Sequence, residues 1–335
     1  MTGRARPAAD PEFAAELRTF LEDGLAGPIG PAAASRTGRL LMTRDRLSHA
    51  LACPVHRSAA WSGEPTGALP GGRTGEPRTF STPLACGALV GALFRQIVAV
   101  GGTDDPMADA LEALSLDDRQ APLVDWIRGL PAAEWSGLAA EVDRQAAGLL
   151  ERWPTLDATW LPRTQEMLRA QLADGAVELG VRVDLAVGRP NRHEASVALL
   201  DVVSGARRPG HADDRRFAAL VAALRGPVPP FAVATYYSRT GELDVDPVDH
   251  EYLVAAAQRC LAAATVLLGG ERAPSDGSTC AACRPLLRRP PVVVAVDGAV
   301  GAGGSTGARG PEHVDPAIRV HPVDPVVAFP QVAAA

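Results

Sequence analysis

The stretch from Ala176 to Gly205 has the pattern of apolar and polar positions around which the rest of the chain is organised. Two apolar, β-branched runs flank a polar Gly-Arg-Pro-Asn-Arg turn, which predicts a β-hairpin. Successive side chains of a strand point to opposite faces, so Asp201 shares a face with Val203 on the second strand. One face of the first strand carries Glu178, Gly180, Arg182 and Asp184. The pattern therefore predicts two carboxylates, Asp184 and Asp201, at the ends of neighbouring strands.

Helical spacing of apolar residues predicts helices before and after this hairpin. The predicted helices are residues 10–23, closed by Gly24, then 43–54, several stretches between 83 and 160, then 213–224 and 247–268. A buried strand, Phe231 to Ser238, is expected between the last two helices. The order helix, two antiparallel strands, helix, strand, helix predicts a mixed α/β fold (α+β), with a small mixed sheet flanked by helices and a helical N-terminal half.

Composition shifts divide the chain into four parts. Residues 1–82 are expected to hold N-terminal helices and a flexible Gly- and Pro-rich loop, and residues 83–175 a helical region. Residues 176–283 form the sheet-bearing core, and residues 284–335 are a Pro-, Gly- and Val-rich tail.

The overall composition is that of a soluble globular protein, with 47% apolar residues and a net charge of −6 over 335 residues. All positive charge is carried by arginine, because the chain contains no lysine. The N-terminus lacks the pattern of a signal peptide, and the apolar run at 83–94 is too short to span a bilayer. We therefore expect a cytoplasmic protein without a membrane partner, whose five cysteines are thiols or metal ligands.

Asp184 and Asp201 are candidate ligands for Mg²⁺ or Mn²⁺, because hard divalent cations take oxygen ligands and often use only one or two carboxylates. A strand-end aspartate also serves as a turn former or a solvated edge charge. The spacing of the two residues leaves both interpretations open.

The surrounding residues add a resemblance. The runs GVRVDLAV and LLDVVSG, followed by a helix and the strand FAVATYYS, resemble the PD-(D/E)XK nuclease superfamily, in particular its RecB, AddB and Cas4-like branch. That branch carries G-(R)-x-D, then D-x-K-(S/T)-G, then a helix with Q-x-x-x-Y. Asp184 and Asp201 match its two acidic metal positions, and Ser204 and Gly205 match the two positions after its lysine. Over about a quarter of the chain, the resemblance implies a restriction-endonuclease-like core acting on DNA, single-stranded or at ends.

The chain departs from the family pattern at four positions. Val203 stands at the lysine position, and Arg216 and Leu220 stand at the Q-x-x-x-Y positions. In the upstream helix the family's G-x-x-x-H is matched by Gly87 to Gly91, with glycine in place of the histidine that binds metal.

The cysteines carry a second part of the resemblance. Cys280 and Cys283 have the spacing of half a zinc or iron–sulfur site. Cys53 lies in an L-S-x-x-x-x-C-P segment like the one that supplies the family's first cluster ligand, while the family's last cysteine position is Arg289. The resemblance implies a cluster held by Cys53, Cys280 and Cys283, with Cys86, Cys260 or a histidine as fourth ligand. A vestige of such a cluster is the competing expectation.

Three functions remain open from the sequence. The losses favour a nuclease-family protein that binds DNA with impaired or lost catalysis. An active deoxyribonuclease would use Asp184, Asp201 and Glu178 as its acids, with Arg182 or Arg207 and Arg208 stabilising phosphate charge. A non-enzymatic module that binds a protein partner is the third.

Overall fold

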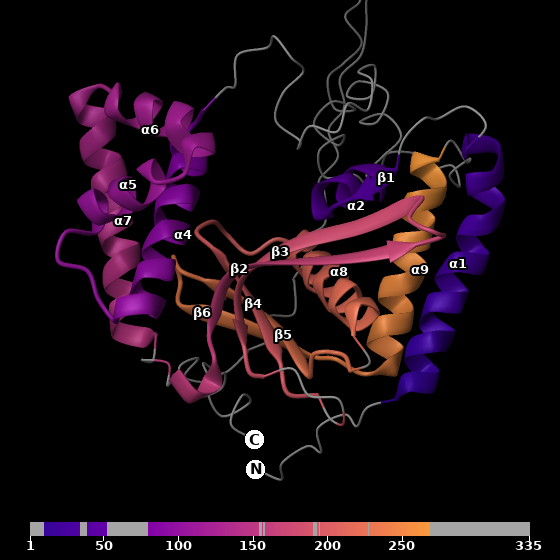
Figure 1. Ribbon diagram of the computed structural model, residues 1–335. Helices are drawn as coiled ribbons and strands as arrows, with labels where there is room; N and C mark the ends of the chain where they lie inside the picture. Colours follow the sequence, from indigo (N-terminus) through magenta and orange to yellow (C-terminus); the bar gives the residue numbers. More distant parts are fainter. Residues whose placement is uncertain are drawn as a thin grey trace, which may run out of the picture.

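The computed structural model describes residues 10–33, 39–51 and 80–268, apart from 154, 155, 157, 190–192, 194 and 227. Within these ranges the chain forms a six-stranded mixed sheet between two groups of helices (Figure 1). The predicted mixed α/β fold is thereby confirmed.

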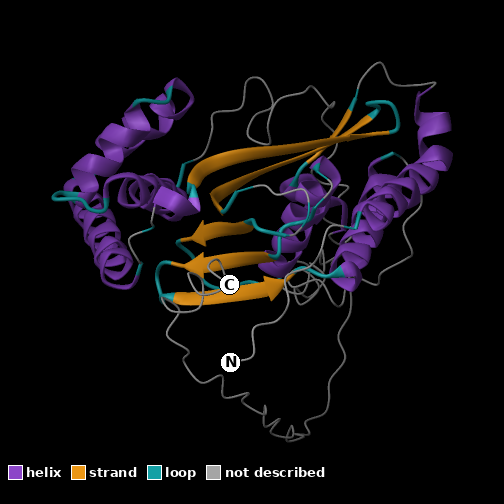
Figure 2. Cartoon of the chain, turned by 60° about the horizontal axis from the view of Figure 1, so that its bottom comes forward, coloured by secondary structure: helices purple, strands orange, loops and turns teal. Residues whose placement is uncertain are grey.

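The sheet follows the order β1-β3-β4-β5-β6, with β2 paired to β3 outside this path. Its strands are β1 (Leu40–Met42), β2 (Arg163–Leu172), β3 (Val177–Val187), β4 (Ala198–Val203), β5 (Ala232–Tyr237) and β6 (Glu242–Pro247). β3 and β4 are antiparallel, as predicted for the hairpin, and β4 is parallel to β5 across the crossover helix α8 (Gly210–Arg225). The two long strands β2 and β3 run away from the layer formed by β4, β5 and β6 (Figure 2).

One edge of β3 is left partly open. β2 occupies the opposite edge of β3 over nearly its whole length. On the open edge, β1 pairs only with residues 177–179 and β4 only with residues 185–187. Residues 180–184 therefore have no strand partner on this edge within the described part of the chain, and the chain leaving β1 enters this interval directly.

Two helical layers bury the two faces of the sheet. On one side lie α1 (Pro11–Ala33), α2 (Arg44–Leu51), α8 and α9 (His250–Leu267). On the other side lie α4 (Thr82–Val100), α5 (Pro106–Ser115), α6 (Ala121–Arg128) and α7 (Ala132–Arg152). Each layer has its own apolar core: Leu199 faces the first, and its neighbours Ala198 and Leu200 face the second. This alternation fixes which face of β4 each side chain uses.

Several predicted element boundaries are wrong. Gly24 does not close the first helix, which continues to Ala33. A Cβ at Gly24 would lie 2.4 Å from Leu261 Cδ2, so this glycine permits close approach of α1 to α9. Asp246 and Pro247 end β6 instead of opening the last helix, whose N-cap is Asp249. β2 lies within the stretch expected to be helical, and β1 and β6 were not predicted.

Helix α4 is, by length and composition alone, apolar enough to cross a membrane. Leu89, Leu93 and Phe94 of this helix are fully buried in the core of the second helical layer. Packing against α5 and α7 accounts for its apolar face.

Candidate acidic site at the open edge of β3

Asp184 lies where the ladders on both sides of β3 are interrupted. The β3–β4 ladder ends at the pair Leu185 and Leu200, and the next positions on the two strands are Asp184 and Asp201. On the other side, the β2–β3 register skips Gln165, which has a positive φ of 54°. A non-glycine residue in this conformation breaks the regular ladder.

Protein donors occupy both oxygens of the Asp184 carboxylate. Oδ2 accepts a hydrogen bond of 2.8 Å from the backbone N–H of Val202 in β4. Oδ1 accepts a hydrogen bond of 2.8 Å from the side-chain amide of Gln165 in β2. The carboxylate thus joins three strands at the point where their backbone pairing is interrupted.

Asp201 has a different partner, Arg44, the first residue of α2. Arg44 Nη2 lies 2.6 Å from Asp201 Oδ2, and 21% and 13% of the two side chains are exposed. Met42 of β1 pairs with Leu179 of β3, so the chain reaches position 44 beside the unpaired interval of β3. The pairing of β1 with β3 delivers the guanidinium to the acid pair.

The electrostatics of the site join four groups. Burial, together with the charge of Asp201, raises the pKa of Asp184, and burial raises the pKa of Asp214 on α8. Burial opposes the charge of Arg44, but Asp201, Asp214 and Asp184 favour it, and on balance the pKa of Arg44 is raised. The guanidinium therefore stays positive among the three carboxylates.

Val203 shares the face of Asp201 by strand alternation and is half-buried at the end of β4. Its carbonyl accepts a hydrogen bond of 3.0 Å from the N–H of Ser238. α4 comes close to the same end of β4, since a Cβ at Gly87 would lie 3.2 Å from Ser204 Oγ. The helix on which the resemblance would put a histidine therefore packs beside the strand on which it would put a lysine.

Gly91, one turn further along α4, points toward Arg95, whose Nη1 lies 3.9 Å from an ideal Cβ at position 91. Burial lowers the pKa of Arg95. The negative charge of Asp184 acts to raise this pKa, and the positive charge of Arg182 lowers it further. Asp184, Arg95 and Arg182 are thus near enough to influence one another. In the described part of the chain, neither arginine forms an ion pair within 4.0 Å.

The structure does not bring the other sequence candidates to the acid pair. Glu178 lies at the far end of β3, where Arg39 and Arg169 pair with its carboxylate. Arg216 pairs with Asp213 and lies over the ring of Tyr252. Leu220 is fully buried in the core between α8 and the sheet.

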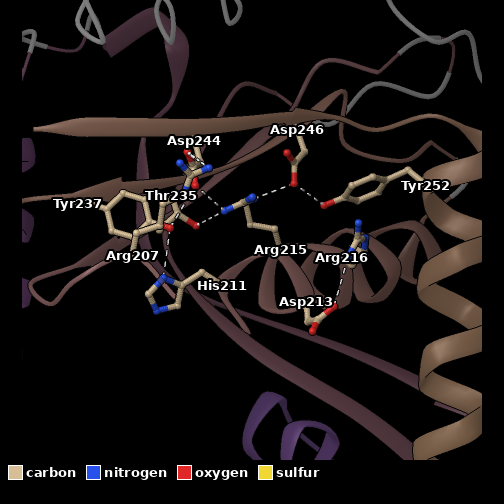
Figure 3. Close-up of polar contacts among 10 residues, drawn as sticks. All are labelled: Arg207, His211, Asp213, Arg215, Arg216, Thr235, Tyr237, Asp244, Asp246 and Tyr252. Carbon is tan, nitrogen blue, oxygen red and sulfur yellow. Dashed lines mark hydrogen bonds and ion pairs between the residues drawn. The ribbon is translucent and has the colours of Figure 1, made fainter. Parts of the chain in front are cut away.

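A separate polar network joins α8 to β5 and β6 (Figure 3). The buried Arg215 donates from Nε to Asp246 Oδ2 at 2.8 Å and from Nη1 to Thr235 Oγ1 at 3.1 Å. Its Nη1 also lies 3.6 Å from Asp244 Oδ2, while Arg207 pairs with Oδ1 of the same carboxylate at 2.9 Å. These acids offset the burial of Arg215 and raise its pKa. The network ties the last two strands to the crossover helix.

His211 extends this network, and the charge of Asp201 also acts on its imidazole. Its Nδ1 lies 3.2 Å from the hydroxyl of Tyr237, which donates to Asp244. Burial and the charges of Arg208 and Arg215 lower the pKa of His211, so its imidazole is neutral at pH 7.

Of the five cysteines, the structure describes Cys86 and Cys260. Cys53, Cys280 and Cys283 lie outside the described residues, as does the tail from 284 to 335. Cys86 and Cys260 are buried free thiols in different apolar cores, and burial raises their pKa to about 11 and about 12. Cys260, named as a possible fourth ligand, lies in the apolar core of the first helical layer.

As arranged, the acid pair suits a guanidinium better than a hydrated divalent ion. Asp184 already accepts from two protein donors, and Asp201 is in contact with Arg44. No group of three or more His, Cys, Asp or Glu side chains in the described ranges is arranged to hold a metal. Mg²⁺ or Mn²⁺ at Asp184 and Asp201 stays a prediction.

Sequence reasoning missed the partners of the acid pair. Arg44 lies on a helix far from the acid pair in sequence, Asp214 lies on the helix that follows β4, and nothing in their local patterns marks either as buried. Gln165 lies on the unpredicted strand β2. Comparison with protein-family models found no match for the chain, and comparison with curated proteins found none.

Proposed function

We propose that this chain is a nuclease-fold protein of the PD-(D/E)XK type that has lost metal-dependent hydrolysis and acts by binding DNA. The observation that carries the proposal is the state of the acid pair. Asp184 serves as a hydrogen-bond acceptor between strands, and Asp201 faces the chain's own Arg44. The fold class is compatible with this proposal, and the resemblance in sequence motifs supports it.

The neighbouring positions also support loss of catalysis. Metal-assisted hydrolysis needs an activated water and a group that stabilises charge on the scissile phosphate. Val203, at the family's lysine position, supplies neither, and Gly91 offers no ligand at its histidine position. Arginine cannot replace the lysine as a base, because its guanidinium stays protonated at any physiological pH.

Two arginines beside the acid pair support binding to a phosphate backbone. Arg95 and Arg182 make no ion pair among the described residues, so their charges remain available for phosphate. Arg207 and Arg216 are less suitable than the sequence implied, because Asp244 and Asp213 neutralise them.

Cleavage assays test the catalytic half of the proposal. Purified protein is incubated with labelled single-stranded DNA and with blunt duplex DNA, in Mg²⁺ and in Mn²⁺, beside the Asp201→Ala variant. We expect no cleavage that Asp201→Ala removes. Metal-dependent cleavage by the wild type that disappears in Asp201→Ala would refute the loss of hydrolysis.

Fluorescence anisotropy with the same DNA tests the binding half. Replacing both Arg95 and Arg182 with glutamine should weaken binding to single-stranded DNA by roughly tenfold, and should reduce the salt dependence by about 1.4, since each phosphate contact contributes about 0.7. Arg169→Gln is the matched control, because this exposed arginine lies at the far end of β3 beside Glu178. If Arg169→Gln and the double variant lost the same DNA affinity, Arg95 and Arg182 would not form the DNA-binding surface.

One observation favours a second candidate, an active nuclease in which arginine replaces the lysine. Arg44 is an arginine in contact with one of the two acids. That function requires cleavage that both Asp201→Ala and Arg44→Gln abolish. Absence of both cleavage and DNA binding would instead favour a module that binds a protein partner.

A further inference from the structure

The buried guanidinium of Arg44 lies in the position where the sequence motifs predict a cation. Its Nη2 lies 2.6 Å from Asp201 Oδ2, and most of both side chains is buried. The residue comes from α2, whereas Asp184 and Asp201 come from β3 and β4. Three separate elements therefore contribute one positive and two negative groups to one small volume.

Charge holds Arg44 in place more than hydrogen bonding does. Its buried Nε has no hydrogen-bond acceptor among the described residues, and the charge of Asp201 raises the pKa of Arg44 more than the hydrogen bond to that carboxylate does. A guanidinium that clamps a carboxylate usually directs two parallel N–H groups at the two oxygens. The contribution of Arg44 to this site is thus mainly its positive charge, which a spherical cation could also supply.

The surroundings require such a charge. Asp214 on α8 adds a third carboxylate whose field acts on Arg44 and Asp201. Burying carboxylates without compensation costs several kcal/mol per ion. Some cation, from the chain or from solution, therefore has to accompany the ionised pair.

We propose that Arg44 is the built-in cation of this acid pair, occupying the place of a divalent ion, and that an uncharged side chain at position 44 opens a Mn²⁺ or Mg²⁺ site on Asp201 and on the lone pairs of Asp184 that its two hydrogen bonds leave unused. This inference concerns cation binding and holds whether or not the protein binds DNA. The pairing of β1 with β3 keeps Arg44 beside the acids, so divalent ions compete poorly in the wild type.

The test compares wild type, Arg44→Gln, Asp201→Asn and the double variant, with Mn²⁺ alone as probe. Mn²⁺ binding is measured by electron paramagnetic resonance and calorimetry, and the melting temperature is recorded with and without Mn²⁺. Arg46→Gln is the matched control, because Arg46 lies on the same helix and donates to the carbonyl of Leu41 instead of a carboxylate.

We expect Arg44→Gln to bind Mn²⁺ at least tenfold more tightly than wild type or Arg46→Gln. Its melting temperature should rise when Mn²⁺ is added. The double variant should lose this gain, because Asp201 is then no longer a carboxylate. Equal Mn²⁺ binding by wild type and Arg44→Gln would overturn the inference, and so would a folded Arg44→Gln that binds no Mn²⁺.

Arg44→Gln could fail to fold, because the buried carboxylates around position 44 then lack a compensating positive charge. In that case, refolding in Mn²⁺ or adding Asp201→Asn should restore the folded state, since either removes the excess negative charge. Failure of both to restore folding would show that Arg44 acts through packing and not as a cation, which also overturns the inference.

Discussion

The Asp184 carboxylate accepts the backbone N–H of Val202 at 2.8 Å, beside the last residue pair of the β3–β4 ladder. A side chain here replaces the backbone acceptor that a continued ladder would supply. Buried N–H groups are costly when unpaired, which gives this aspartate a structural use independent of any metal. The acid pair of the sequence motif is therefore also part of the sheet.

Asp184→Ala should lower the free energy of unfolding by about 1–3 kcal/mol, because it leaves the Val202 N–H without its acceptor. Asp184→Asn keeps an acceptor oxygen and should cost less. Chemical denaturation at pH 7 measures both. An alanine variant as stable as the asparagine variant would contradict the structural use of this carboxylate.

The same residue predicts a pH dependence. Burial and Asp201 raise the pKa of Asp184 in the folded state, so its contribution to stability is fully present below the unfolded pKa and is lost as pH rises through the folded pKa. Asp184→Asn lacks this titration. Its stability relative to wild type should therefore improve as pH rises from 4 to 8, as followed by thermal unfolding, and a constant difference would contradict the prediction.

Gly24→Ala should destabilise the protein, because the new Cβ would meet Leu261 at 2.4 Å across the contact of α1 with α9. Overpacking of this kind costs about 1–3 kcal/mol. Gly27→Ala is the matched control on the same helix, where nothing lies within 4 Å, and the better helix propensity of alanine should add about 0.5–1 kcal/mol. Denaturation measures both variants, and Leu261→Ala should relieve the first.

Arg215 and Arg216 are neighbours on α8 with opposite expectations. Arg215→Met leaves the half-buried carboxylates of Asp244 and Asp246 without the guanidinium between them, and should cost up to about 3–5 kcal/mol of unfolding free energy. Arg216→Met removes a half-exposed pair with Asp213 and should cost about 1 kcal/mol or less. Adding Asp246→Asn to Arg215→Met should recover part of the loss. Equal costs at 215 and 216 would contradict the network.

The sequence predicted the elements whose period is strong and whose ends carry turn or cap residues. The β3–β4 hairpin and helices such as α7 belong to this group. β2 alternates clearly only at Leu168, Ala170 and Leu172, after a polar first half that hides its strand period. β6 carries three acidic residues and β1 has three residues, so neither shows an apolar strand pattern.

The site was predictable to the extent that it depends on local register. The hairpin pattern placed Asp184 and Asp201 on neighbouring strands. In the structure they are the first residues of the two strands beyond the last ladder pair, Leu185 and Leu200. Arg44 was not predictable, because its burial depends on the pairing of β1 with a strand far along the chain. Charge compensation of a buried acid is a tertiary property that a local pattern does not record.

Val203→Lys tests the register of the acidic site. By alternation the new ammonium would share the face of Asp201, whereas Val202 is half-buried and packs against the core of the second helical layer. Val203→Lys should therefore fold with modest loss, and Val202→Lys should lose several kcal/mol by burying an unpaired charge. Circular dichroism and denaturation compare the two variants. If Val203→Lys were the less stable of the two variants, Val202 and Val203 would be assigned to the wrong faces of β4.

Once folding is established, the same lysine tests the proposed loss of hydrolysis. Val203→Lys alone should cleave no DNA, because Arg44 still faces Asp201. Combining it with Arg44→Gln frees the acid pair for Mn²⁺, and Gly91→His adds a ligand at a position whose nearest neighbour, Arg95 Nη1, lies 3.9 Å from an ideal Cβ. We expect Mn²⁺-dependent cleavage of labelled DNA only in the combined variant, and its loss on adding Asp201→Ala. A folded combined variant that binds Mn²⁺ yet cleaves no DNA would show that the missing lysine, the missing histidine and the occupied acid pair are not sufficient to explain the proposed loss of activity.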